Sequence, residues 1–164
     1  MFRVAIVALI VLARPLYPQA VIGTVLVSGE ADDAPPPSGY VVRVSVESPD
    51  FGALVSAVCS DDRAAYRASL GYVERTREEV VTTRELRSLL DDGLVVEELV
   101  DSSGQFRIDS LIPRRYVVWG DQPPESELSF QVLATVDYVG ERQELALYHN
   151  RRVHVLAAVC SMKH

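Results

Sequence analysis

The chain has 164 residues, enough for one domain with a hydrophobic core and too few for two domains of ordinary size. Hydrophobic residues make up 48% of the sequence and charged residues 24%, a globular composition that excludes a disordered or collagen-like chain. The formal net charge is -7, so the clustered positive charge that nucleic-acid binding needs is missing, and we expect no nucleic-acid partner.

The first 20 residues have the order of features of a secretory signal peptide. Arg3 supplies a positive charge, residues 4–13 form an apolar run, and Arg14 and Pro15 end it. The run is about half as long as a membrane-spanning helix, and a buried N-terminal helix or strand is the alternative. The pattern predicts export to the periplasm or the cell exterior.

Cleavage of this leader fits two positions, after Ala13 or after Ala20. Its removal takes away two of the 16 basic residues and leaves 14 against 23 acidic ones, a net charge of -9. No later apolar stretch is long enough for a membrane span. We therefore expect residues 1–20 to be the signal peptide and residues 21–164 to form a single domain.

The first part of that domain predicts strands. Residues 21–28 are rich in β-branched side chains, and the acidic, proline-rich residues 29–38 predict a loop. Residues 40–48 alternate between two faces, with Val42, Val44 and Val46 on one and Arg43, Ser45 and Glu47 on the other. This pattern indicates a half-buried strand, and residues 54–59 are a further candidate strand.

Residues 60–92 predict a helical insert. Ser60 is placed to cap a first helix that would end near Gly71. A second helix is expected to begin at Thr82, whose spacing to Glu85 fits a capping box, and to end at Gly93. The residues between these helices fit either a helix or a strand.

Beyond the insert the strand pattern returns. Residues 94–100 and 105–108 predict a hairpin, with Gly104 supplying the positive φ of its turn. Four more strands are expected, at residues 115–119, 128–138, 141–148 and 151–159. Short strands separated by turn signals predict a mainly β, immunoglobulin-like antiparallel β-sandwich.

One run of residues resembles a known family. The run consists of Asp101, Gly104, Phe106, Ile108, Leu111, Pro113, Tyr116 and Val118, and it is preceded by Gly23, Val25 and the segment 35–44. This spacing is similar to the carboxypeptidase regulatory-like domain, a transthyretin-like β-sandwich. The resemblance covers residues 21–48 and 94–119 and implies a fold rather than an activity, because these motif residues build the sandwich.

The sequence departs from that family in two places. Arg114 stands where the family usually has a glycine after the proline, so the local turn must differ. The stretch from about residue 52 to 93 is longer than the simple strand connection of the family. The helical insert is therefore the most individual part of the chain.

The chain has two cysteines, Cys59 and Cys160. An even number in an exported chain favours a disulfide between them, and two buried free thiols are the alternative. The bridge would close a loop of about 100 residues and, on the chain-entropy model, contribute about 4 to 5 kcal/mol.

The sequence lacks the common catalytic and metal-binding motifs. The sequence holds no Gly-x-Ser-x-Gly motif and no local cysteine–histidine signature. His149, His154 and His164 are expected as edge or loop histidines rather than metal ligands. The acidic pairs at 91–92 and 97–98 are expected to be solvated, with a calcium site as the minor alternative. We therefore expect no enzyme activity, no cofactor and no metal.

Two aromatic residues are the candidate ligand contacts. Tyr116 and Trp119 lie on one predicted strand and would offer a platform for sugar stacking, although an aromatic residue there is more often part of the core.

The leader, the sandwich pattern and the missing catalytic motifs together favour an exported, non-enzymatic binding or structural module. Its partner would be a protein or a glycan. One alternative is a carbohydrate-binding module that uses Trp119 and nearby tyrosines. The other is a protein that docks a partner through the helical insert at 60–92.

Overall fold

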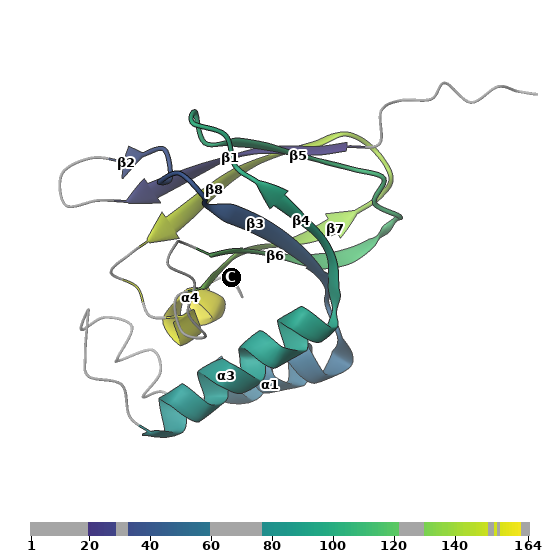
Figure 1. Ribbon diagram of the computed structural model, residues 1–164. Helices are drawn as coiled ribbons and strands as arrows, with labels where there is room; N and C mark the ends of the chain where they lie inside the picture. The colour runs from purple at the N-terminus through teal and green to yellow at the C-terminus, as the bar shows by residue number, and fades with distance from the viewer. Residues whose placement is uncertain are drawn as a thin grey trace, which may run out of the picture.

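The computed structural model describes residues 20–28, 33–59, 77–121, 130–150, 153 and 155–161. Within these residues the chain forms eight strands and three helices. The strands build two stacked sheets, and the helices form a third layer below one of them (Figure 1). The predicted mainly β sandwich is confirmed. Residues 1–19 of the predicted signal peptide and the first helix of the insert lie outside the described residues, whereas Ala20, the last residue of the predicted leader, begins β1.

The first sheet, called sheet A, is arranged around β1 (Ala20–Ser28). β1 pairs antiparallel with β2 (Asp33–Ala34) and β5 (Gln105–Asp109), and parallel with β8 (Gln143–Asn150). The parallel pair departs from the expected all-antiparallel sandwich. It arises because the chain changes sheet between β7 and β8, so β8 enters sheet A from the end where β1 begins.

The second sheet, called sheet B, is antiparallel throughout. Its spatial order is β4 (Leu94–Leu99), β3 (Val41–Val46), β6 (Arg114–Asp121) and β7 (Gln131–Tyr138). β4 and β7 are its edge strands, and β3 and β6 form its centre.

Three helices cover the outer face of sheet B (Figure 1). They are α1 (Pro49–Cys59), α3 (Arg77–Asp92) and α4 (Val155–Ser161). None of the helices in the described part of the chain is long and apolar enough to cross a membrane.

The layers enclose two hydrophobic cores. The core between the sheets contains buried side chains from both, among them Val21, Val25, Val42, Val44, Phe106, Ile108, Tyr116, Val118 and Leu147. The core between sheet B and the helices contains Phe51, Val55, Leu86, Leu90, Val117, Trp119, Phe130, Val132, Val155, Leu156 and Val159. Sheet B is therefore buried on both faces, whereas the helices leave the outer face of sheet A open.

Residues 54–59 form the end of helix α1, so the prediction of a strand there was wrong. The helix begins at Pro49, which is favoured at a first helical position, and Asp50 follows in the first turn. The Ser48 hydroxyl accepts a hydrogen bond from the Phe51 N–H at 3.1 Å and caps the helix. Phe51 and Val55, four residues apart, place one helix face in the core.

The second helix of the insert is present but starts earlier than expected. α3 begins at Arg77, so Thr82 lies inside the helix and the predicted capping box does not form. The Thr83 hydroxyl instead donates to the Glu79 carbonyl at 2.7 Å. The helix ends at Asp92, next to Gly93, as the sequence predicted.

The predicted last strand, residues 151–159, was also wrong. β8 ends at Asn150, and α4 begins at Val155. Val155, Leu156 and Val159 are buried against sheet B at helical spacing. A short apolar run fits a strand or a helix, and here the packing selects the helix.

The expected hairpin of residues 94–100 and 105–108 does not form, because β4 belongs to sheet B and β5 to sheet A. The turn between them crosses from one sheet to the other. The Asp101 carboxylate accepts hydrogen bonds from the N–H groups of Ser103 (2.8 Å) and Gln105 (2.9 Å). Gly104 has the predicted positive φ, 84°.

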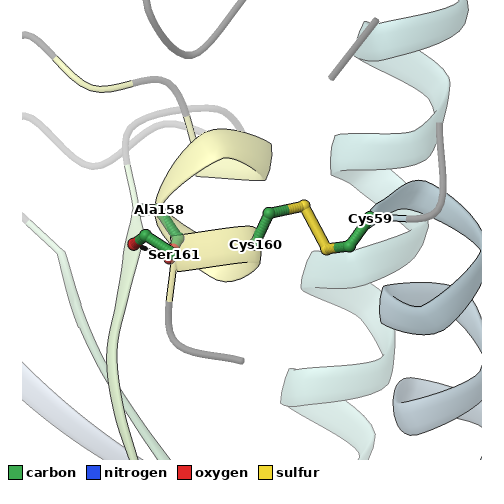
Figure 2. Close-up of a disulfide and its surroundings, with 4 residues drawn as sticks. All are labelled: Cys59, Ala158, Cys160 and Ser161. Atoms are coloured by element: carbon green, nitrogen blue, oxygen red, sulfur yellow. Dashed lines mark hydrogen bonds between the residues drawn. A yellow bond between two sulfur atoms is a disulfide. The ribbon is translucent and has the colours of Figure 1, made fainter. Parts of the chain in front are cut away.

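The predicted disulfide between Cys59 and Cys160 is confirmed. It joins the end of α1 to α4, with the two Cα atoms 5.2 Å apart (Figure 2). The bridge spans 101 positions of sequence and ties together two helices of the covering layer.

Replacing both cysteines with alanine is expected to lower the free energy of unfolding by about 4 kcal/mol, because the long loop is no longer closed in the unfolded state. Urea unfolding of the oxidised protein and of C59A/C160A measures the difference. Hydrogen exchange should show α4 losing more protection than the strands of sheet A. A change below about 1 kcal/mol would contradict the expectation.

Candidate functional site

A buried charge network connects the helix layer to sheet B. Asp121 at the end of β6 is fully buried and accepts hydrogen bonds from Nη1 of Arg43 at 3.0 Å and from Nη1 of Arg87 at 2.7 Å. The Arg43 Nε also bonds the Glu97 carboxylate at 2.6 Å. These four residues come from β3, β4, β6 and α3, so the network fixes the position of all four elements.

The network explains why β3 is buried on both faces, which corrects the expected half-buried strand. Arg43 and Ser45 were predicted to face solvent, but the helix layer covers them. The Ser45 hydroxyl donates to the Leu90 carbonyl at 2.7 Å and accepts from the Trp119 Nε1–H at 2.9 Å. Buried polar groups of this kind are tolerated because each one is paired.

Tyr116 and Trp119, the predicted ligand contacts, belong to the two cores. The Trp119 side chain is 0% exposed, and the guanidinium groups of Arg43 and Arg87 lie 5.1 and 4.6 Å from its ring centre. Tyr116 is buried between the sheets, and its hydroxyl donates to the Ile112 carbonyl at 2.9 Å. Sugar stacking needs an exposed ring face, so the placement of these residues supports the core interpretation.

Tyr40 and His149 form a second buried polar contact, between the sheets. The Tyr40 hydroxyl and the His149 Nδ1 share a hydrogen bond of 2.7 Å. The Tyr40 ring lies over Gly120, where a Cβ atom would come within 2.0 Å of its hydroxyl. Burial, and secondarily the negative charge of Asp121, raises the pKa of Tyr40, so the phenol stays neutral.

His149 is therefore a core residue of β8 rather than the edge or loop histidine that we expected. His154 and His164 lie outside the described residues. In the described part of the chain no three or more histidine, cysteine or acidic side chains gather into a group that would hold a metal. The contacts of Asp121 with Arg43 and Arg87, and of Tyr40 with His149, join the layers.

Three exposed apolar side chains lie along β4. Leu94, Val95 and Leu99 are 41%, 51% and 64% exposed on this edge strand. A hollow of about 470 Å³ lies where β4 begins, between the start of α1 and the end of α3. Its lining is formed by Val46, Ser48, Asp50, Leu89, Asp92, Gly93, Leu94, Val95 and Arg114. We call the exposed side of β4 together with this hollow the β4 surface.

Tyr148 is a second exposed feature and lies on the outer face of sheet A. Its side chain is 56% exposed, whereas the other aromatic residues in the described ranges are buried. The parallel register places it beside Leu26, and it places Ala146 beside Thr24 on the same face.

The comparisons with known proteins find fold similarities only. No family model matches the sequence, and no curated protein matches it significantly. The resemblance to the carboxypeptidase regulatory-like family therefore stays a prediction.

Solved structures with a related arrangement include a Pseudomonas aeruginosa protein proposed to bind carbohydrate. It is 11% identical, has a TM-score of 0.45, and the match covers 81% of this chain and 89% of that one. A minor pilin of Streptococcus agalactiae is 11% identical, with a TM-score of 0.42 and coverage of 82% and 50%. This chain thus spans half of the pilin. These similarities carry no conclusion about function.

Neither exposed feature was singled out by the sequence analysis. The hairpin interpretation paired β4 with β5 and so concealed that β4 is an edge strand. One signal was present, because three apolar residues followed by Glu97 and Glu98 lack the alternation of a strand with one buried face. Tyr148 was included in a predicted strand, 141–148, but its direction depends on the register, which the sequence did not establish.

Changing Asp121 to asparagine is expected to lower the free energy of unfolding by about 3 kcal/mol, because two buried guanidinium groups lose their carboxylate. Asp91→Asn is the matched control, since Asp91 pairs with the same Arg87 at 3.1 Å from an exposed position. Its cost should stay below about 1 kcal/mol. Equal losses in the two variants, measured by urea unfolding, would show that the network does not hold the layers.

Proposed function

We propose that this chain is an exported, non-enzymatic β-sandwich protein that acts as a binding or structural module in the periplasm or outside the cell. One contrast carries the proposal. The buried polar side chains Asp121 and His149 are bonded inside the molecule, whereas apolar side chains are exposed along β4. Exposed apolar residues on an unpaired edge are a feature of surfaces that bind other molecules.

Two observations support export. The leader pattern at residues 1–20 is that of a secretory signal. The bridge between Cys59 and Cys160 leaves no free cysteine, and such bonds form and persist in oxidising compartments.

The placement of two titratable side chains supports the proposed non-enzymatic role. A general base needs access to a substrate, but the His149 ring is buried against Tyr40. Asp121 is enclosed by two arginines in the same way. These groups stabilise the fold and are not exposed to a reactant.

Expression of the full chain in a bacterial host tests the proposal. Fractionation and intact-mass measurement should find an exported protein shortened after Ala13 or Ala20, with the Cys59–Cys160 peptide pair under non-reducing conditions. An uncleaved cytoplasmic protein with two alkylatable thiols would refute export. A specific turnover abolished by one polar substitution would refute the non-enzymatic role.

Carbohydrate binding is a second candidate function, and Tyr148 is the observation that favours it. Its exposed ring lies on an open sheet face beside Leu26. Polar side chains of β5 on the same outer face, Gln105 and Arg107, lie across β1 beside Thr24 and Ile22 and offer hydrogen bonds to hydroxyl groups farther along a glycan. An exposed aromatic ring suits sugar stacking.

A glycan array probed with the purified protein tests this candidate. Tyr148→Ala should weaken any glycan that binds by about tenfold, whereas Tyr148→Phe keeps the ring and should retain most of the affinity. Circular dichroism checks that both variants are folded. Binding that is unchanged in Tyr148→Ala, or the absence of any binding, would end the candidate.

A further inference from the structure

Strand β4 is an edge strand with an unoccupied side. It pairs with β3 through residues from Leu94 to Leu99, and no other strand of the described ranges pairs with it (Figure 1). The backbone N–H and C=O groups that point away from β3 are therefore available to an added strand. The opposite edge strand of the same sheet, β7, differs because α4 packs against it.

The side chains of β4 favour contact with another molecule. Leu94, Val95 and Leu99 are exposed, although edge strands usually avoid apolar side chains at such positions. An added strand would cover these side chains and satisfy the backbone groups at the same time. This is the mode of recognition in which a peptide extends a sheet.

The hollow at the start of β4 lies in the path of such a strand. Leu94 and Val95 line it, together with the acidic residues Asp50 and Asp92 and with Arg114. Its volume of about 470 Å³ is in the range of pockets that hold a small ligand or large side chains. A segment that follows β4 would therefore place its end between apolar and mainly acidic side chains.

The negative charge of β4 indicates which kind of segment would bind beside it. Glu97 and Glu98 lie in the strand, and Asp92 lies just before it. The Glu97 side chain stays half exposed although it bonds Arg43. Lysine or arginine at alternate positions of an added strand would lie on the face of Glu98 and pair with it, since opposite charges across a sheet stabilise the pairing.

The same charges disfavour a second copy of this chain. Antiparallel pairing of two β4 strands about their centre brings Glu97 and Glu98 of both copies opposite or diagonally next to each other. Like charges at such positions destabilise a strand pair. The acidic pair therefore acts against self-association and leaves a basic partner favoured.

We propose that the β4 surface binds an extended segment of another protein, with alternating apolar and basic residues, as an additional strand of sheet B. This inference rests on the proposed role as a binding module and specifies its partner. Neighbouring residues of a strand point to opposite faces, so Glu98 lies on the face of β4 opposite to Glu97 and Leu99. Apolar side chains of the segment would cover Leu94, Val95 and Leu99, and its basic side chains would pair with Glu98.

Synthetic peptides of about eight residues, long enough to span β4, test the inference on the purified mature protein. A fluorescent peptide of alternating valine and lysine should bind saturably in an anisotropy titration. A peptide with glutamate in place of lysine should bind at least about tenfold more weakly. Hydrogen exchange should show new protection of the β4 amides only with the lysine peptide.

Charge reversal separates a specific site from general attraction to an acidic protein. Glu98→Lys should weaken the lysine peptide and strengthen the glutamate peptide, each by about tenfold. Glu144→Lys is the matched control, because it makes the same charge change at an exposed position on the outer face of sheet A. It should change either affinity by less than about twofold.

Four results would overturn the inference: no binding of the lysine peptide, binding without protection of β4, equal effects of the two charge reversals, or dimers that protect β4 without peptide. The last result, seen by sedimentation and hydrogen exchange, would identify a second copy as the occupant. Failure of export would show separately in the fractionation experiment, because peptide binding is measured on purified protein.

Discussion

The buried carboxylate of Asp121 is the interaction on which the layered structure depends. A charge enclosed in the protein must be paired, and Asp121 is paired with one arginine from β3 and one from α3. Both partners are held only when the helix lies over sheet B, where Arg87 also stacks on Trp119. The network thus makes the helical layer an integral part of the fold, not an addition to an independent two-sheet sandwich.

The sequence predicted those parts of the fold whose signals are local. The strands of the sandwich, the end of α3 at Gly93 and the turn at Gly104 follow from β-branched patterns and glycine positions. Burial of Arg43 was not predictable, because an alternating strand reads the same whether water or a helix covers its polar face. The existence of the disulfide was predictable from the two cysteines, but the two helices that it joins were not.

Packing decided the elements that the sequence left open. Residues 155–159 and 54–59 are short apolar runs, and tertiary contacts made each of them part of a helix. The burial of the candidate ligand contacts was also left open, because local sequence patterns do not show which residues pack against them. Trp119 was a candidate ligand contact although a core position was the commoner alternative, and the helical layer, which the pattern of that strand does not reveal, encloses it. The β4 surface exists because β4 joins sheet B as an edge strand, and that pairing depends on residues far away in the sequence.

The parallel pair of β1 and β8 has a consequence for the order of assembly. The first described strand acquires its longest pairing from the last described one, and the disulfide joins α1 to α4 across 101 positions of sequence. Sheet A and the covalent ring can therefore close only after β8 and α4 are available. Such long-range closure slows folding. During synthesis β1 is therefore available long before its partner β8, so the sandwich cannot be completed strand by strand.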